Sequence, residues 1–514
     1  VVDGSASAPF KADVVIEGPR IVSILPPKSS DDGASIDCTN LVLCPGFVDI
    51  HGHSDLEVLR NPSMRSKIGQ GITTEVAGNC GIGVFPAEIG DSLLAELTSD
   101  VLGRYPGAGW PSFSSYLTKL KEKGSGTNTA FLQAHSTLRS HAMEGKANRT
   151  ATEEEIRRMC LYLQQSLEEG CIGLSSGLYY APCIFADRKE LLALLSVVAS
   201  FDRLFSVHLR CEGSDILDSI QEVLDLARRS GVKLQISHLK VIGKKNQRLV
   251  PSMLALIEQA RVEGVDVQFD QYPYEYGSTS LFSLLPPPYL KLGRSELKSA
   301  LGSESERRII KAMMEEGKGW DSIASLCGWD DIKVLVLHSN PQYEGLSMNE
   351  VAQLRNQDPY EAFFDVLVQE EGSALMTDVT QSQDSIKRIL SHPLMCFGTD
   401  ALYAGQKAHP RSYQAALHLL ERYWKQEPVL SLEQLIAKMT SCGAKRLGLV
   451  DRGLVSKGYK ADLVLFDPVE LADRSDDGHP DAPFNGLRLV MVNGTVAFQN
   501  GRYTDSTSGS ILLG

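Results

Sequence analysis

Apolar residues in the central part of the chain gather in short runs, and longer stretches with helical spacing separate these runs. Between the runs, the segments 152–169, 214–230 and 252–263 repeat apolar residues every three or four positions, as helices packed on a sheet do. This alternation predicts parallel strands joined by crossover helices. The expected strands are 46–51, 72–78, 129–135, 171–176, 204–209, 233–238, 265–270 and 394–398. Eight such strands predict a (β/α)₈ TIM barrel.

One interval in this alternation is much longer than the others. Residues 275–390 separate the seventh expected strand from the eighth, and they include an expected strand at 332–338 and an expected helix at 359–371. Because loops that follow barrel strands carry function, we interpret 275–390 as an insertion, or lid region, on the catalytic face.

The two ends of the chain share a sequence pattern of short expected strands interrupted by Gly and Pro. Residues 12–25 and 41–45 have it near the start, and 461–467 and 487–504 near the end, where Asn-Gly pairs at 493–494 and 500–501 signal hairpin turns. We therefore expect a small β-sandwich domain formed from both termini, 1–45 and 447–514. It would accompany a barrel domain at 46–446. Two unrelated terminal extensions are the alternative.

Composition narrows the possible partners. The 514 residues carry a formal net charge of −13, which argues against a nucleic-acid partner because phosphate binding needs a basic surface. No apolar run reaches the ~18 residues that a membrane span requires, and no leader pattern opens the sequence, so we expect a cytoplasmic protein without a membrane partner. The ten cysteines have no regular spacing and are expected to be reduced.

The first expected barrel strand ends in two histidines. His51 and His53 stand two positions apart, so both imidazoles can point to the same side of the chain, and Gly52 between them leaves room for close approach. Zinc accepts neutral imidazole ligands. An HxH pattern alone is common by chance, but at the end of a barrel strand it indicates a metal site.

Other metal-competent side chains follow other strands. Cys80 follows the second, His208 and His238 end the fifth and sixth, and Asp400 follows the eighth. Each has a structural alternative: a buried turn cysteine, a histidine bonded to a carbonyl group, or an aspartate that caps the next helix. Their joint occurrence at strand ends favours a metal centre.

These residues lie within longer motifs, and through them the chain resembles the D-aminoacylase (N-acyl-D-amino-acid deacylase) family of the amidohydrolase superfamily nearly end to end. The Asn-Cys-Gly at 79–81 is distinctive, because it puts a cysteine where most of the superfamily has a carboxylated lysine or a glutamate as bridging ligand. The motifs are PGFVDIHGHSD, GITTEVAGNCGIG, GLSSGLYYAPC, HLRCEG, ISHLK, QYPYEYGSTSL, FGTDAL, HPRSY, KMTSCGAKRLGLVDRGLVSKGYKADLVLFDP and VNG.

The resemblance implies zinc-dependent hydrolysis of the amide bond of N-acyl-D-amino acids. It implies one tightly held Zn²⁺ on Cys80, His208 and His238. A second, weaker position would use His51, His53 and Cys80, with Asp400 close by. A metal ion lowers the pKa of bound water and polarises a carbonyl group, and Asp400 can carry the proton from the water to the leaving amine.

The matching motif positions also suggest how an N-acyl amino acid is held. Lys240 and Arg411 supply the cations that an α-carboxylate needs, and Tyr180, Tyr272 and Ser278 add hydroxyl groups. The segment 272–285 is rich in Tyr, Ser, Leu and Phe, which favours an apolar D-side chain. Lys291 and Arg294 are the nearest cations, but they lie outside the motif.

The sequence departs from the family pattern at two places and leaves alternatives open. TDALYAG follows the eighth strand where SDG is expected, and Ser136 follows His135 where glycine is expected, which puts the substrate side chain in doubt. The alternatives are an N-acyl-D-glutamate or N-acyl-D-aspartate deacylase, a cyclic amidase with a carbamylated lysine bridge, or an inactive barrel scaffold, which typically lacks metal ligands. The sequence leaves the oligomeric state open.

Overall fold

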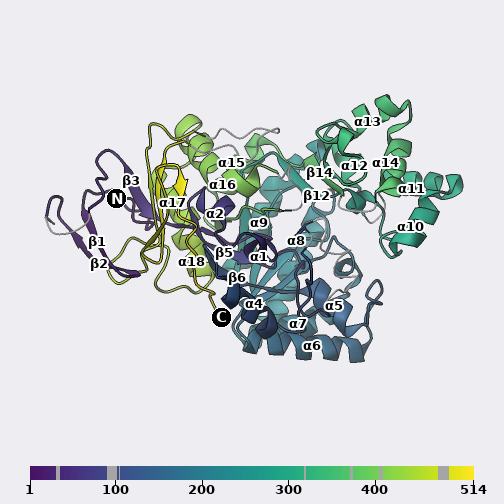
Figure 1. Cartoon of the computed structure of the whole chain (residues 1–514). Coiled ribbons are helices and arrows are strands. Elements are labelled where there is room, and N and C mark those ends of the chain that lie inside the picture. Colours follow the sequence, from purple (N-terminus) through teal and green to yellow (C-terminus); the bar gives the residue numbers. More distant parts are fainter. Residues whose placement is uncertain are drawn as a thin grey trace.

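The eight expected barrel strands are all present in the computed structural model, which describes residues 1–29, 35–88, 101–103, 105–317, 320–370, 374–403, 409–472 and 485–514. The barrel lies in the middle of an elongated molecule, with a β domain at one end and the insertion at the other (Figure 1). The predicted fold class is confirmed. The barrel strands are β4 (Phe47–Asp49), β5 (Ile72–Ala77), β6 (Asn128–Phe131) continued by β7 (Gln133–Ala134), β8 (Gly173–Gly177), β9 (Leu204–His208), β10 (Lys233–Ile236), β11 (Val267–Gln271) and β15 (Met395–Phe397).

Neighbouring barrel strands run parallel, and the first and last strands close the ring. Two parallel sheets, β4-β5-β6 and β15-β11-β10-β9-β8-β7, follow the order of the chain. The Ile50 backbone N–H donates to the Phe397 carbonyl at 3.2 Å, and Gly52 bridges to Ala401 beyond the strand ends. Because all strands are parallel, their carboxyl ends meet at one face, where the active site of a TIM barrel lies.

Helices surround the barrel strands. The three expected helices are confirmed as α6 (Glu153–Glu168), α8 (Ile216–Ser230) and α9 (Val250–Val262). Thr152 and Glu155 form a reciprocal capping box at the start of α6, and α8 ends at Gly231 in a left-handed conformation. The other helices of the barrel region are α1 (Glu57–Arg60), α2 (Arg65–Ile68), α4 (Phe113–Lys123), α5 (His135–Ala142), α7 (Arg188–Ser200), α15 (Gln383–Ser391), α16 (Arg411–Leu420), α17 (Leu432–Met439) and α18 (Ser441–Arg446). Short helical turns are η1 (Cys183–Phe185), η2 (Lys244–Leu249) and the π-helical η5 (Glu421–Gln426).

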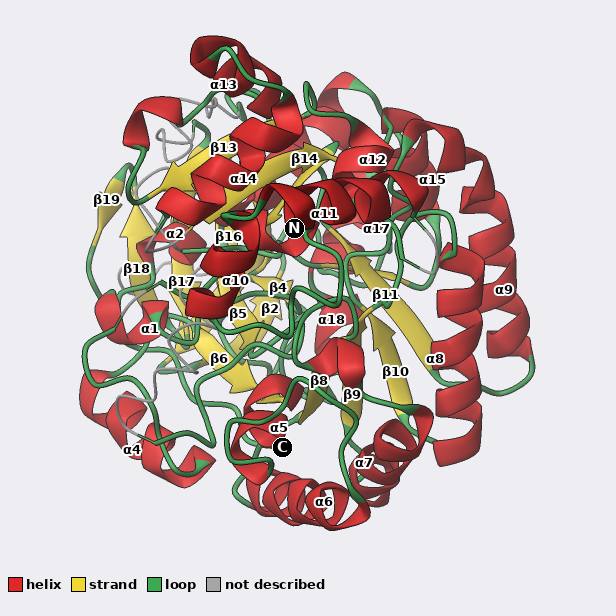
Figure 2. Ribbon diagram, turned by 90° about the vertical axis from the view of Figure 1, so that its right-hand side faces the viewer, coloured by secondary structure: helices red, strands yellow, loops and turns green. Residues whose placement is uncertain are grey.

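The insertion has its own sheet and its own hydrophobic core. Strands β12 (Tyr276–Ser280), β14 (Ala374–Val379) and β13 (Ile332–Leu337) pair antiparallel in that order, and the helices of the insertion lie in front of the barrel in Figure 2. The expected strand at 332–338 is confirmed as β13 and the expected helix at 359–371 as α14 (Pro359–Gln369), although residue 371 lies outside the described residues. Helix α15 packs against barrel strand β15, and the expected limits of the insertion, 275–390, stay a prediction. The remaining elements of the insertion are η3 (Leu281–Leu284), α10 (Arg294–Leu301), α11 (Glu304–Glu316), α12 (Ile323–Cys327), η4 (Pro341–Tyr343) and α13 (Met348–Arg355).

Both ends of the chain build the β domain. The hairpin β1 (Asp13–Glu17) and β2 (Arg20–Leu25) packs against a five-stranded sheet through a separate apolar cluster that includes Ile21, Leu463 and Leu489. The sheet has the order β19 (Arg502–Tyr503), β18 (Thr495–Gln499), β17 (Leu487–Val492), β16 (Leu463–Phe466) and β3 (Val42–Pro45). The last residues leave this domain, because Ser510 and Leu512 hydrogen bond to Thr129 at the start of β6. The expected domain limits stay a prediction.

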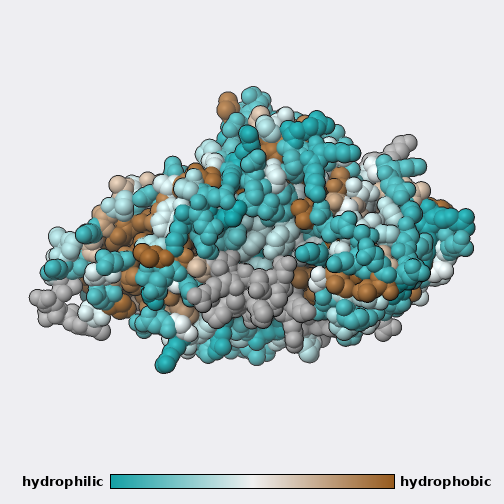
Figure 3. Space-filling view, turned by 90° about the horizontal axis from the view of Figure 1, so that it is seen from above, coloured by the Kyte–Doolittle hydropathy of each residue, from teal (hydrophilic) through white to brown (hydrophobic). Residues whose placement is uncertain are grey.

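The surface seen from above is mainly hydrophilic, with apolar side chains in scattered groups (Figure 3). Among the described residues, no helix combines the length and apolar character needed to cross a membrane.

Candidate metal centre and substrate pocket

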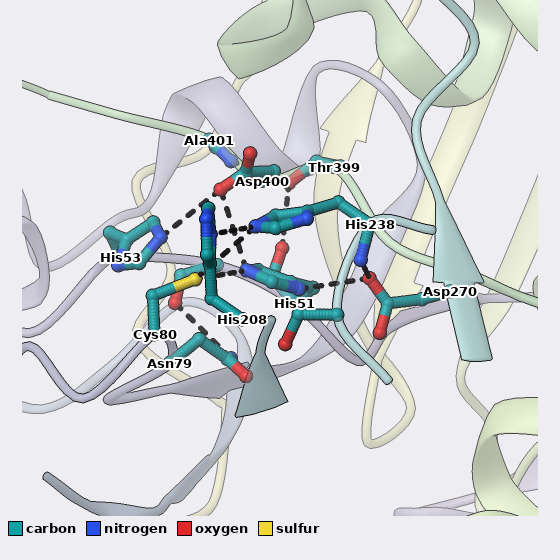
Figure 4. A network of polar contacts seen from close by, with 12 residues as sticks. His51, His53, Asn79, Cys80, His208, His238, Asp270, Thr399, Asp400 and Ala401 are labelled. Carbon is teal, nitrogen blue, oxygen red and sulfur yellow. Dashed lines mark hydrogen bonds and ion pairs between the residues drawn. The ribbon is translucent and has the colours of Figure 1, made fainter. Parts of the chain in front are cut away.

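Six side chains from different strands converge at the carboxyl face of the barrel (Figure 4). All are buried, with at most 7% of any one exposed. They are His51 and His53 beyond β4, Cys80 beyond β5, His208 at the end of β9, His238 beyond β10, and Asp400 beyond β15.

The donor atoms of these side chains face one another at short range. Cys80 Sγ lies 3.3 Å from His51 Nε2 and 3.5 Å from His238 Nε2, and His208 Nδ1 lies 2.8 Å from His238 Nε2. Asp400 Oδ1 lies 3.1 Å from His53 Nε2 and 3.4 Å from His51 Nε2. The structure thus brings all six predicted ligands together.

The donor set fits a divalent metal ion. Ligand atoms of His51, Cys80, His238 and Asp400 lie within 4.8 Å of one another, and His238 shares a second such group with His208 and Glu212. Burial lowers the pKa of His208 and His238 well below the usual range, which keeps both imidazoles neutral, the form that binds metals. A thiol, neutral imidazoles and a carboxylate together are the ligands that zinc prefers.

Three of the six residues have an unusual backbone conformation. Cys80, His238 and Asp400 have φ angles of 53°, 34° and 51°, in the left-handed region. Each such residue costs on the order of 1–3 kcal/mol, and these conformations persist where the surrounding structure enforces them at functional sites. The strands therefore end in sharp turns that aim the three donor groups at the centre.

Asp270, which the sequence analysis did not identify, fixes two of the histidines. Its Oδ1 accepts hydrogen bonds from His51 Nδ1 and from the His238 backbone N–H, both at 2.8 Å. Its Oδ2 accepts from Gln235 Nε2 at 2.9 Å. Since the Nδ1 atom of His51 is occupied, its Nε2 atom is left to face Cys80.

Two buried cations stand beside the metal centre, each paired with a carboxylate. Lys240 Nζ lies 2.7 Å from Glu212 Oε2 and 3.0 Å from His238 Nδ1. Arg411 Nη1 lies 3.0 Å from Asp400 Oδ2, and its Nη2 donates to the Ser278 carbonyl at 3.1 Å. Burial opposes the charge on Asp400, but Arg411 and His51 hold the pKa of that carboxyl well below its usual range. Glu212 is a second residue that the sequence analysis missed.

The predicted hydroxyl groups line the same pocket. The Arg411 guanidinium lies over the ring of Tyr272, with its Cζ atom 4.9 Å from the ring centroid. The Tyr180 hydroxyl accepts from Thr279 Oγ1 at 3.1 Å. Ser278 Oγ and Arg411 Nε are buried and have no hydrogen-bond partner among the residues that the structure describes. Unsatisfied buried polar atoms are costly, so these two point to a ligand with hydrogen-bonding groups.

The residues at which the sequence departs from the family pattern lie nearby. Ser136 and Leu402 line a second, wider cavity that reaches the metal centre through Cys80, His238 and Asp400. His135 takes no part in the centre, because it bonds Ser176 and Glu190 instead. Of the TDALYAG segment, residues 404–405 lie outside the described residues.

Comparison with known proteins extends this picture to the whole chain. The model of the Amidohydrolase family matches residues 34–282 and 302–498. D-aminoacylase of Alcaligenes xylosoxydans xylosoxydans is 30% identical over 100% of this chain and 96% of its own length. N-acyl-D-glutamate deacylase of the same organism is 31% identical over 97% of this chain and 92% of its own length.

A solved structure agrees with these sequence relatives. The N-acyl-D-glutamate deacylase of Bordetella bronchiseptica, in complex with zinc and a phosphonate mimic of the tetrahedral intermediate, superposes with a TM-score of 0.85. It is 30% identical in sequence, and the match covers 100% of this chain and 98% of the deacylase. Together with the buried Cys80, which stands among the histidines as its motif predicts, these matches show that the chain belongs to the D-aminoacylase family of the amidohydrolases.

Proposed function

We propose that this protein is a zinc-dependent hydrolase that cleaves the amide bond of N-acyl-D-amino acids and releases a D-amino acid and a carboxylate. The observation that carries the proposal is the placement of two buried cations, Lys240 and Arg411, next to a cysteine-containing metal centre. A metal centre suits hydrolysis of an amide, and the cations suit an α-carboxylate. For the location of the protein in the cell, the cytoplasm stays a prediction.

Cys80, His208 and His238 would hold the tightly bound zinc ion, and His51, His53 and Cys80 would hold a weaker second one. When bound, zinc would polarise the acyl carbonyl group and lower the pKa of water. The protein contributes the orientation of the donors. Asp270 holds His51 by Nδ1, and Glu212 Oε1 lies 3.2 Å from Nδ1 of His238.

Asp400 is the proposed general base and acid. Its Oδ1 faces the histidines, whereas its Oδ2 is held by Arg411 at 3.0 Å. The oxygen that faces the centre would take the proton of the attacking water and deliver it to the leaving amine nitrogen. The ionised state that Arg411 favours is the state in which Asp400 can accept that proton.

Three contacts would select the D-enantiomer. The scissile carbonyl group would lie at the metal centre, the α-carboxylate would lie against Arg411, Lys240 and the free Ser278 hydroxyl, and the side chain would fill the remaining pocket. Discrimination between mirror images requires three such fixed points, so the handedness depends on the pocket as well as on the zinc.

The structure gives no support to a lysine-bridged cyclic amidase. Lys240 Nζ lies 3.0 Å from Nδ1 of the proposed ligand His238, but this ammonium group is engaged by Glu212 at 2.7 Å. Burial opposes its charge, yet Glu212 raises the pKa of Lys240, which disfavours the neutral amine that carbamylation needs. In the proposed centre, Cys80 would take the bridging place. A linear amide remains the better substrate class.

A substrate panel tests the proposal. Zinc-loaded full-length protein should release free amine from N-acetyl-D-methionine or another N-acetyl-D-amino acid, and not from the L-enantiomer. Dihydrouracil and hydantoin should not be opened. Equal rates on both enantiomers would refute the stereochemical part, and full activity after exhaustive chelation with no metal detected would refute the metal chemistry.

A further inference from the structure

The insertion supplies part of the wall of the substrate pocket. Asp378, in the central strand β14 of its sheet, is 3% exposed and lines the same pocket as His208, His238 and Arg411. In the register of the sheet, Asp378 pairs with Gly277 of β12.

Gly277 shows where the Asp378 carboxylate points. A Cβ atom built on Gly277 would lie 3.4 Å from Asp378 Oδ1 and 3.0 Å from the Tyr272 hydroxyl oxygen. The Asp378 carboxylate and the Tyr272 hydroxyl therefore border the same small space, which the absence of a side chain on Gly277 leaves open. Tyr272 in turn lies under Arg411.

The other charged groups of the pocket are already paired. Lys240 is paired with Glu212, and Arg411 with Asp400. Asp321 accepts hydrogen bonds from the Ser214 hydroxyl and backbone. Within the described part of the chain, no ion pair or side-chain hydrogen bond joins the Asp378 carboxylate to another residue.

Electrostatics favour a positive charge at this position. Burial, with a smaller contribution from Glu212, raises the pKa of Asp378 to about 6. The positive charges of Lys240 and Arg411 act in the opposite direction and only partly offset this rise. At neutral pH the carboxylate is therefore charged and buried, a state that is costly without an opposite charge. A substrate with a second carboxylate would add repulsion there.

Apolar side chains form part of the wall of the same pocket. Ile242, Ile323 and Leu326 line it together with Thr380. An aliphatic chain fits such walls, and its end would reach the carboxylate.

We infer that Asp378 selects the substrate side chain, an inference that rests on the proposed function. The enzyme prefers N-acyl-D-amino acids whose aliphatic side chain ends in an ammonium or guanidinium group. This inference differs from the apolar preference that residues 272–285 indicate. The difference arises because β14, a strand absent from the sequence prediction, adds its carboxylate to the pocket.

The test compares three substrates, of which N-acetyl-D-lysine and N-acetyl-D-norleucine differ only at the end of the side chain. The zinc-loaded full-length protein is given N-acetyl-D-lysine, N-acetyl-D-norleucine and N-acetyl-D-glutamate, and kcat/KM is measured for each. We expect D-lysine to exceed D-norleucine by about 10- to 100-fold, as for a buried charge-assisted contact, and D-glutamate to be the poorest substrate.

Variants assign the preference to Asp378. Asp378→Asn should bring the ratio of D-lysine to D-norleucine close to one, mainly through KM for D-lysine, and should change kcat/KM for D-norleucine by less than about threefold. Asp378→Ala removes the carboxylate without adding the amide group of asparagine, and it should bring the ratio close to one as well. The matched control is Asp330→Asn, an exposed acid of the same insertion, which should keep the ratio of the unaltered protein.

The outcomes separate the two proposals. Turnover of D-norleucine at a rate equal to or above that of D-lysine, or a best rate on D-glutamate, would overturn the inference and leave the hydrolase standing. A ratio unchanged in both Asp378 variants would likewise overturn the role of Asp378. No turnover of any D-substrate by the metal-loaded protein would overturn the proposed function and the inference with it.

Discussion

Replacing Asp270 by asparagine should weaken metal binding without removing a metal ligand. Asp270 accepts hydrogen bonds from His51 Nδ1 and the His238 backbone, each at 2.8 Å, while its other oxygen accepts from Gln235. The carboxylate is 1% exposed, so solvent does not screen these bonds. Asparagine has the same shape, but it loses the charge and replaces one acceptor by a donor.

The magnitude follows from the number of affected bonds. Hydrogen bonds to a charged group contribute about 1.5–3 kcal/mol, and neutral ones about 0.5–1.5 kcal/mol. Each of the two bonds should lose about 1 kcal/mol, one at His51 of the weaker proposed position and one at His238 of the tight position, which amounts to ~2 kcal/mol, or ~30-fold in affinity, over both positions together. This agrees with the 10- to 100-fold effect typical of groups that orient metal ligands.

Competition with a chelator of known affinity measures the effect. Asp270→Asn should bind zinc about 30-fold more weakly than the unaltered protein, taken over the two proposed positions together, and saturating zinc should restore much of its kcat. Asp266→Asn is the matched control, because Asp266 precedes β11 at its opposite end and pairs with Arg261 and Arg446. Zinc affinity within twofold of the unaltered protein in Asp270→Asn would refute the orienting role.

Four further predictions concern the same pocket. Cys80→Ala should lose both the tightly bound zinc and the activity, since it removes the donor shared by both proposed metal positions; elemental analysis that still found one zinc per chain would contradict the assignment. Asp400→Asn should keep the tight zinc while kcat falls by roughly 10²–10⁴-fold, the contribution of general acid–base catalysis, and a kcat near that of the unaltered protein would move the proton transfer elsewhere. Arg411→Ala should raise KM by more than about tenfold, because a buried charged contact to the α-carboxylate is lost; initial-rate kinetics with an unchanged KM would exclude that contact. KM for N-acetyl-D-lysine should rise as the pH falls through about 6, because Asp378 takes up a proton there and loses its charge; a pH profile parallel to that of N-acetyl-D-norleucine would argue against it.

The framework of the barrel and the six ligand candidates could be predicted because their signals are local. Apolar runs of strand length have few other interpretations once helices alternate with them, and His51 and His53 share a face by the geometry of one strand. Residues that follow parallel strands meet at one face whatever the details of packing. The order of the strands alone is therefore enough to predict that Cys80, His208 and Asp400 lie close together.

The residues that support these ligands depend on contacts far apart in the sequence. Asp270 resembles any acid at a strand end, and only closure of the ring between Ile50 and Phe397 sets it against His51. Glu212 reaches Lys240 from a neighbouring strand end. Asp378 lies in a strand that follows residues 371–373, and its place above the site depends on how the whole insertion folds. No local pattern carries such information.

The left-handed backbone at Cys80, His238 and Asp400 bears on any attempt to transplant this centre into another barrel. A designer who copied only the six side chains onto ideal strand ends would place three donors on backbone that points them elsewhere, since unstrained turns do not favour these φ angles. The recipient would need the loops beyond β5, β10 and β15 together with the buried groups that hold them, such as Asp270, which bonds the His238 backbone directly. The unit that can be transferred is therefore the set of three strained turns together with the buried residues that hold them in place.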